Sequence, residues 1–227
     1  MSRRLHVDRV AAGPQALSGD EAHYARDVLR LVPGDRVTLF DDDGQEAPAT
    51  VLSVSRHEVT LLAEGPRAAA PTAPAVVILG VPRPSLVDEA ITLGTEAGAT
   101  AFWLFRAERS QVDPPRVERL ERVARAAARQ CRRGGLPSLR VLGGLGEALA
   151  EANALGLPRL VGDPRAEVPV PACPGGVVLS IGPEGGFTPT ERQAHHHAGF
   201  VGARLGTHVL RAPTAVAVGL GLALSRW

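Results

Sequence analysis

The sequence contains no lysine, only two cysteines and few aromatic residues, which make up 4% of the chain. Cys131 and Cys173 share no metal-ligand spacing and are too few for a disulfide framework, so we expect reduced thiols. The longest apolar run, 215–224, is about half the length of a membrane span. No apolar stretch follows the arginines near the N-terminus, as a signal peptide would require. These absences predict a soluble, cytoplasmic protein without membrane contact.

The composition that remains is typical of a globular protein. Hydrophobic residues make up 44% of the 227 residues, and 25 arginines balance 24 acidic residues to a formal charge of +1. This composition argues against disorder and against a polyelectrolyte. The charge is nevertheless uneven, because residues 106–133 hold 9 arginines and 4 acidic residues, whereas residues 1–72 hold 8 and 11.

Residues 1–70 are predicted to form a small β-barrel. Strand patterns cover 36–40, 49–54 and 58–62, and the first two are joined by the hairpin-type turn Asp41-Asp-Asp-Gly44. One helix is expected from Ser18 to Leu31, with Ser18 as N-cap and Glu21 completing a capping box. Residues 65–74 contain three prolines and no large apolar residue, which is typical of a linker.

Residues 75–227 are predicted to form an α/β domain. Apolar strands are expected at 76–81, 101–105, 139–142, 160–161, 177–181 and 203–205. Helices are expected at 85–97 and 115–133, between the strands at 142 and 160, from Pro189, and at the end of the chain. Unbroken apolar strands that alternate with helices indicate a parallel sheet covered on both faces.

The helix expected at 115–133 has an apolar face and an arginine face. At 100° per residue, arginines 119, 122, 125, 129, 132 and 133 lie opposite the apolar residues, and only Glu118 and Glu121 are near enough to offset them. A plain solvated surface and a binding face for an anionic partner both remain open on this pattern. A phosphate backbone is the obvious anion, because guanidinium binds phosphate bidentately.

A glycine-rich loop, Gly182-Pro-Glu-Gly-Gly186, follows the apolar strand at 177–181. Glycines at the carboxyl end of a parallel strand allow a ligand to approach the backbone closely, although a tight turn with positive φ would also require them. The next helix is expected to begin with Thr188 as N-cap, Pro189 at the first position and Glu191 completing a capping box.

Two other motifs are weaker. Gly143-Gly-Leu-Gly146 lacks both the third glycine and the acidic residue of a dinucleotide-binding loop. His195-His-His197 is predicted to be a surface cluster without a metal, because neighbouring side chains on a helix point 100° apart and cannot converge on one ion. We find no Ser/His/Asp or paired-carboxylate arrangement in the sequence.

Two motifs taken together resemble a known family. Ile181-Gly-Pro-Glu-Gly-Gly-Phe-Thr188, followed by Leu205-Gly-Thr-His-Val-Leu-Arg211, is similar to the paired C-terminal motifs of the bacterial 16S rRNA uridine-N3 methyltransferases, the RsmE family of the SPOUT superfamily. Other parts of the family pattern are matched by Val28-Leu-Arg-Leu-Val-Pro-Gly-Asp35 with Leu39-Phe-Asp41, by Thr95-Glu-Ala-Gly98, and by Glu108-Arg-Ser110 with Gln130-Cys-Arg-Arg133. The likeness covers nearly the whole chain.

The resemblance implies a PUA-like β-barrel that binds RNA over residues 1–70 and a SPOUT α/β methyltransferase domain with a trefoil knot over residues 75–227. It implies a homodimer that uses S-adenosyl-L-methionine to methylate N3 of a specific uridine in the 16S rRNA of the small ribosomal subunit. No metal is implied. Because knots are almost absent from proteins, periodicity alone predicts none.

The resemblance also implies site residues. The cofactor-binding positions carried over are Leu179, Ile181, Gly182, Gly186, Leu205, Gly206, Val209 and Leu210. Arg211 is expected to stabilise the uridinate that forms when N3 loses its proton, and Glu184 to orient the methionine part or to help with the proton. We expect RNA contacts from Arg26, Arg30, Arg83, Arg109, Arg125, Arg129, Arg132 and Arg133.

Three positions depart from the family pattern. Pro213 stands where the family has glutamate, Leu93 where it has lysine, and Arg83-Pro84 where it has Lys-Gly. The lost carboxylate bears on the active site, because an acidic residue at a helix N-terminus is favourable and often functional. Two alternatives therefore stay open: a catalytically weakened RNA-binding protein of the same fold, and a methyltransferase that acts on a different RNA position. A nicotinamide enzyme that uses Gly143–Gly146 is a third.

Overall fold

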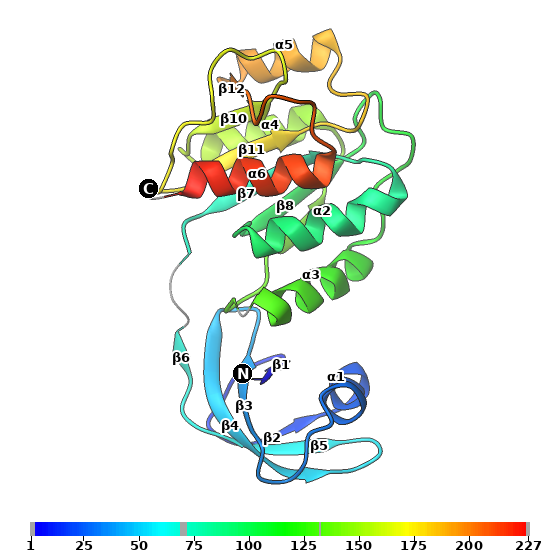
Figure 1. Cartoon of the computed structure of the whole chain (residues 1–227), viewed down its shortest axis with the longest axis vertical. Coiled ribbons are helices and arrows are strands. Elements are labelled where there is room, and N and C mark those ends of the chain that lie inside the picture. Colours follow the sequence, from blue (N-terminus) through cyan, green and yellow to red (C-terminus); the bar gives the residue numbers. More distant parts are fainter. Residues whose placement is uncertain (1–2, 69–71, 132, 226–227) are drawn as a thin grey trace. The chain divides into compact units, whose positions relative to one another are not determined.

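The computed structural model describes residues 3–68, 72–131 and 133–225, and these form two compact units (Figure 1). The first unit comprises residues 1–71 and 128–136, and the second comprises residues 72–127 and 137–227. The chain therefore passes between the units at the proline-rich segment and again within and just after one helix. The sequence pattern predicted only the first of these passages.

The first unit contains a mixed sheet with the strand order β1-β3-β4-β5-β2, and β6 pairs with β4. The strands are β1 (Arg3–His6), β2 (Gly13–Leu17), β3 (Arg36–Phe40), β4 (Gln45–Val54), β5 (Val59–Ala63) and β6 (Arg67–Ala68). All pairings are antiparallel except that of β1 with β3. The predicted strands appear as β3, β4 and β5, whereas β1, β2 and β6 were not predicted.

The predicted helix from Ser18 to Leu31 is present only in part. It consists of α1 (Gly19–His23), which continues into the π-helical turn η1 (Tyr24–Val28). The predicted capping box is wrong, because the Ser18 side chain makes no capping hydrogen bond. Gly19 has a φ of 56°, so the chain enters the helix through a left-handed residue, and the Glu21 carboxylate contacts Arg129 instead.

The second unit contains a parallel sheet with the strand order β12-β10-β11-β7-β8-β9. The strands are β7 (Ala75–Gly80), β8 (Ala101–Phe105), β9 (Ser138–Val141), β10 (Arg159–Gly162), β11 (Val177–Ile181) and β12 (Val201–Ala203). Every residue of β7, β8 and β11 is buried, as the unbroken apolar patterns predicted. The last strand lies two residues earlier than expected.

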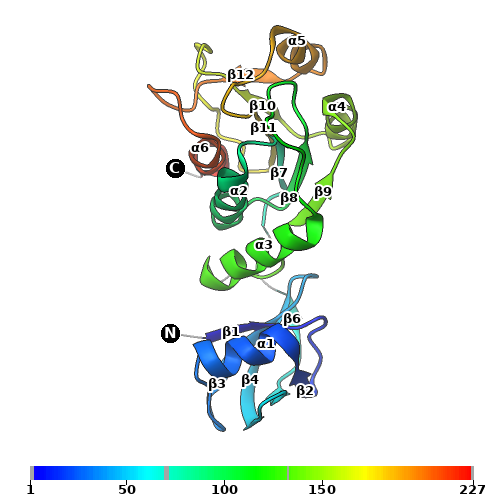
Figure 2. The same ribbon diagram turned by 90° about the vertical axis from the view of Figure 1, so that its right-hand side faces the viewer.

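Helices cover both faces of this sheet, as Figure 2 shows. The helices are α2 (Pro84–Glu96), α3 (Val117–Cys131), α4 (Leu145–Ala154), α5 (Pro189–His197) and α6 (Ala212–Leu224). Val77 and Leu79 of β7 join the apolar core beneath α2 and α6, whereas Val76 and Ile78 join the core beneath α4 and α5. This alternation confirms the predicted parallel sheet with helices on both faces.

Glycines bring α2 and α6 close to each other and to the sheet. A Cβ atom added to Gly94 of α2 would lie 2.6 Å from the Phe102 ring and 2.9 Å from Val216 of α6. One added to Gly219 of α6 would lie 2.6 Å from Leu179 of β11. This close packing holds α6 against α2 and against β11. No helix in the described part of the chain is long and apolar enough to cross a membrane.

Candidate active site

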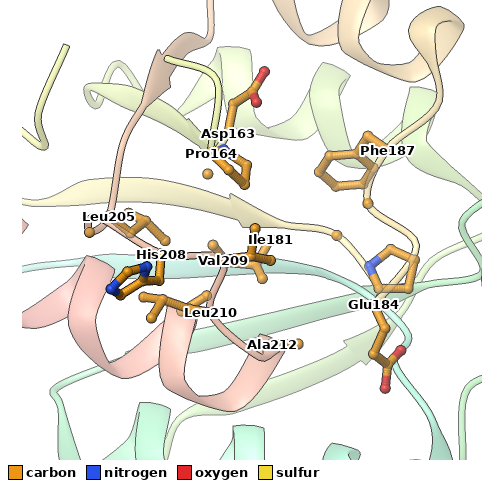
Figure 3. Close-up of a pocket in the computed structure, with 16 residues that line it drawn as sticks. Asp163, Pro164, Ile181, Glu184, Phe187, Leu205, His208, Val209, Leu210 and Ala212 are labelled. Carbon is orange, nitrogen blue, oxygen red and sulfur yellow. The ribbon is translucent and has the colours of Figure 1, made fainter. Parts of the chain in front are cut away.

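A pocket opens at the carboxyl ends of β10 and β11 (Figure 3). Three segments line it: the turn after β10, the glycine-rich loop after β11, and the segment that leads into α6. The lining residues are Gly162, Asp163, Pro164, Ile181, Gly182, Pro183, Glu184, Gly186, Phe187, Leu205, Gly206, His208, Val209, Leu210, Ala212 and Ala215. This end of a parallel sheet is where α/β proteins usually bind ligands.

The glycine-rich loop is a tight turn against the pocket. Gly186 donates its N–H to the Pro183 carbonyl at 2.7 Å and has a φ of 65°, a conformation that favours glycine. A Cβ atom on Gly182 would lie 3.2 Å from the backbone nitrogen of Phe187, so a larger residue would crowd the turn. The two readings of these glycines, turn geometry and close backbone approach to a ligand, are therefore compatible.

Arginines from two other segments hold this loop. The backbone N–H of Arg83, the N-cap of α2, donates to both carboxylate oxygens of Glu184 at 3.1 and 3.2 Å, and its side-chain Nε lies 3.4 Å from the same carboxylate. Arg109 Nη1 donates to the Gly185 carbonyl at 2.7 Å. Arg83 and Arg109, which were expected to contact RNA, thus anchor the loop, and each uses only some of its N–H donors to do so.

Glu184, expected to orient the methionine part of the cofactor or to help with the proton, is bonded to the start of α2. Its side chain belongs to the pocket wall, but the carboxylate points away from the Asp163 side of the pocket and toward the N-terminus of α2 (Figure 3). A carboxylate is favourable at this position because it balances the positive end of the helix. Glu184 therefore anchors the loop on α2, and its expected role toward the cofactor or the proton stays a prediction.

The end of the loop is fixed by a capping box, which confirms the prediction for Thr188 and Glu191. The Glu191 N–H donates to Thr188 Oγ1 at 3.2 Å, and the Thr188 N–H donates to the Glu191 carboxylate at 2.8 Å. The other carboxylate oxygen accepts from the Glu108 N–H at 3.0 Å. The carboxylate of Glu191 is thus fully used to join α5 to the segment after β8.

The segment before α6 places Arg211 at the pocket rim. Leu210 and Ala212, its two neighbours, line the pocket, whereas the Arg211 side chain is exposed. Arg211 is the N-cap of α6, with Pro213 in the first turn as predicted. Its Nη2 atom lies 3.8 Å from Glu89 Oε1, at the outer limit of an ion pair, so the guanidinium keeps donors for another partner.

The structure brings together seven of the eight expected cofactor-binding residues. Leu179 is the exception: it lies on the same face of β11 as Ile181 but two residues before it, fully buried in the core against Gly219. Sequence reasoning missed Gly162, Asp163 and Pro164. Gly162 ends β10, the strand beside β11, and Asp163 and Pro164 follow it, but strand order cannot be read from one sequence.

The arginine face of α3 is not uniform. Arg122 is exposed, and Arg119 pairs with Asp88 at 2.7 Å. Arg129, in contrast, lies over the Tyr24 ring at 4.6 Å, contacts Glu21 and leaves 16% of its side chain exposed, and burial lowers its pKa. Arg129 therefore packs within the first unit, and the RNA contact expected of it stays a prediction.

The other expected RNA contacts differ in exposure. Arg30 is exposed, with a φ of 52° at the end of η1, and Arg26 pairs with Asp27. Arg125 and Arg133 are half-buried, and burial lowers the pKa of Arg133. Arg132 lies outside the described residues.

The histidine triplet is only partly the predicted surface cluster. His196 and His197 are exposed, but His195 is fully buried on the side of α5 that faces β11. Helical spacing shows that the three rings diverge, yet it does not show which one faces the sheet. Among the described residues, no three histidine, cysteine or acidic side chains come together as a metal site.

Comparison with known proteins agrees with this architecture. The family model of the RNA methyltransferase domain matches residues 69–224, and that of the RNA methyltransferase PUA domain matches residues 17–64. Ribosomal RNA small subunit methyltransferase E of Mycobacterium bovis is 36% identical over 93% of this chain and 87% of its own length. The protein of that name from Synechocystis is 30% identical over 97% of this chain and 76% of its own length.

A solved structure is also similar over almost the whole chain. A Legionella pneumophila methyltransferase, determined in complex with its bound cofactor SAM, has a TM-score of 0.83 and 25% identity, with 97% of this chain and 96% of that chain covered. A PUA unit together with a parallel α/β unit of the matched type defines an RNA methyltransferase. The chain belongs to the ribosomal RNA small subunit methyltransferase E family. This confirms the family predicted from the paired motifs, whereas the trefoil knot stays a prediction.

Proposed function

We propose that this enzyme transfers a methyl group from S-adenosyl-L-methionine to N3 of a uridine in 16S rRNA of the small ribosomal subunit. The observation that carries the proposal is the pocket, in which the two family motifs meet at the carboxyl ends of β10 and β11. Relatives that cover most of the chain are named for methylating small-subunit RNA, and a similar structure holds the same cofactor.

The pocket fits such a cofactor. The side chains of Ile181, Leu205 and Leu210 offer apolar surface for an adenine ring, and the glycines leave backbone groups open to polar atoms. A Cβ atom on Gly162 would lie 2.8 Å from Ile181 Cδ1, so the turn after β10 also depends on a small residue. When bound, the cofactor supplies the electrophilic methyl group.

Arg211 is the residue to which we assign the chemistry. Uridine N3 is a weak acid that becomes nucleophilic only after losing its proton, and a guanidinium beside it stabilises the resulting anion. Arg211 has an exposed side chain between two pocket-lining residues, so it can reach a base presented at the rim. The target base must be unpaired or extruded to enter the pocket.

The remaining predictions belong to this proposal. We assign RNA contacts to exposed arginines, among them Arg30 and Arg122, and we keep the homodimer and the trefoil knot as expected family features. We also keep residues 1–70 and 75–227 as domain bounds and the cytoplasm, where small ribosomal subunits reside, as the place of action. Pro213 begins α6 without the carboxylate of the family pattern, so the reaction must proceed without that group.

Calorimetric titration with S-adenosyl-L-methionine tests the proposed cofactor. We expect saturable binding by the unaltered chain and loss of binding in Gly186→Val, because a β-branched residue is strained at positive φ and would enter the pocket. Gly13→Val, which has a φ of 99° and open space around it in the first unit, is the matched control. Absence of binding to the unaltered chain would favour the RNA-binding protein of the same fold.

A further inference from the structure

His195 is a fully buried imidazole that the proposed reaction does not use. Its Nδ1 atom lies 2.7 Å from the Glu191 backbone carbonyl, and its Nε2 atom lies 2.8 Å from Ser180 Oγ. A carbonyl oxygen can only accept, so Nδ1 carries the proton and Nε2 accepts from the Ser180 hydroxyl. Both nitrogens of the neutral ring thus have a hydrogen-bond partner, and the ring is the tautomer that is protonated on Nδ1.

Aromatic rings surround this imidazole. The ring centroid of Phe187 lies 4.6 Å from that of His195, and the ring of Phe200 meets it edge-on at 5.2 Å. Phe105 stacks with Phe187, with 6.4 Å between the ring centroids. Burial lowers the pKa of His195, and the charged residue that acts on it is Glu191, whose carboxylate is already bonded to Thr188 and Glu108. The ring is therefore neutral at pH 7.

Two of the residues that His195 contacts, Ser180 and Phe187, flank or belong to the glycine-rich loop of the pocket. Ser180 directly precedes Ile181 and Gly182, which line one end of the pocket wall. Phe187 lines the other end, and its ring and backbone nitrogen stand against Gly182. The His195 imidazole therefore contacts Ser180, which directly precedes the loop 181–187, and Phe187, which ends it.

We propose that His195 is a positioning residue for the cofactor loop. Its hydrogen bond with Ser180 and its ring contact with Phe187 hold the two ends of the loop 181–187 in the geometry that binds S-adenosyl-L-methionine. The inference rests on the proposed function, because it assigns a role toward the cofactor named there. It predicts that the affinity for the cofactor depends on His195 and Ser180, although neither side chain lines the pocket.

Four variants test the pair. His195→Phe keeps an aromatic ring but removes both hydrogen bonds, and Ser180→Ala removes only the donor to Nε2. We expect each to raise the Kd for S-adenosyl-L-methionine about tenfold, because each leaves a buried polar group without its partner. The double variant should raise it little further than the larger single effect, since the same bond is lost. His195→Gln, whose carbonyl oxygen can accept from Ser180, should recover part of the affinity.

A matched control separates positioning from stability. Leu149→Ala removes a buried side chain of α4 from the same apolar core, without touching the pocket. It should lower the Tm while leaving the Kd unchanged. Nitrogen NMR of labelled histidine in the full chain should show the proton of His195 on Nδ1.

The outcomes are distinct. An unchanged Kd in both His195→Phe and Ser180→Ala, an equal rise of the Kd in Leu149→Ala, or a proton on Nε2 in the neutral ring would each overturn the inference. Should His195→Phe not fold, Ser180→Ala alone decides the question of affinity. If the unaltered chain binds no S-adenosyl-L-methionine, the proposed function fails first, and that result differs from a failure confined to the variants.

Discussion

At the residue scale, the site depends on what each charged side chain is bonded to. Glu184 and Arg129 are both charged residues in promising sequence contexts, yet one anchors a loop to α2 and the other packs over Tyr24. Within the described residues, Arg211 pairs with a single carboxylate, that of Glu89 at 3.8 Å, and it flanks the pocket. Residue type suggested roles for all three, but partners decide which is available for chemistry.

Arg211→Ala is expected to lower the rate of methyl transfer by about a hundredfold to a thousandfold, the range seen when one stabilising donor is removed from a transition state. The side chain is exposed, so the Tm should be unchanged. Single-turnover methylation measures the rate, and a thermal melt measures the Tm. Arg204→Ala removes an exposed arginine of the same connecting segment and serves as control. Full activity in Arg211→Ala would remove Arg211 from the mechanism.

The stability of the second unit is expected to fall as the pH drops below about 6.5. Burial lowers the pKa of His195 from its ordinary value of 6.5, so below that pH the unfolded chain binds a proton that the folded chain resists. The stabilising contribution is complete above the unfolded pKa and is lost as the pH falls toward the folded pKa. Urea unfolding of the chain and of His195→Phe at several pH values isolates this contribution. If the free energies of unfolding of the unaltered chain and of His195→Phe changed in parallel with pH, this contribution would be contradicted.

At the element scale, the sheet of the second unit was predictable because its strands are buried on both faces. The sequences of β7, β8 and β11 are unbroken apolar runs. Such runs can be recognised without knowing which strands pair with one another. β1 was missed because its four residues include two arginines and a histidine, and its parallel pairing with β3 joins distant parts of the chain. The turn η1 was missed because π-helical bonding has no sequence period of its own.

The close packing of α2 is expected to make Gly94 intolerant of substitution. Gly94→Ala should destabilise the second unit by about 1–3 kcal/mol, because the new methyl group would overlap the Phe102 ring and Val216. Gly146→Ala in α4 is the matched control, since nothing lies within 4 Å of its added Cβ and the change favours the helix. Urea denaturation compares them, and equal stability of the two variants would contradict the packing argument.

At the scale of the whole molecule, the fold class and the family could be predicted, but much of the site could not. The paired motifs indicated seven of the pocket residues, whereas the turn after β10 and the burial of His195 depend on strand order and helix orientation. The arginine face of α3 shows the same limit. A helical wheel separates Arg122 from Leu120 but cannot show that Arg129 meets Tyr24.

Charge reversal at Arg116 and Arg122 together is expected to weaken RNA binding and to reduce the salt slope by about two, because each phosphate contact releases roughly one counterion. Both side chains are exposed and line one shallow groove beside α3. Binding to a 16S rRNA fragment at several salt concentrations measures the slope. An unchanged slope would mean that this face is an ordinary solvated surface.

The central claim concerns the reaction itself, and methyl transfer tests it most directly. Small ribosomal subunits that lack the modification are incubated with the enzyme and labelled S-adenosyl-L-methionine, and the RNA is then digested and its nucleosides identified by mass spectrometry. The account predicts labelled N3-methyluridine at a single position in the presence of the unaltered chain and its absence with Arg211→Ala. Label on another nucleoside, or no transfer by a chain that binds the cofactor, would contradict it.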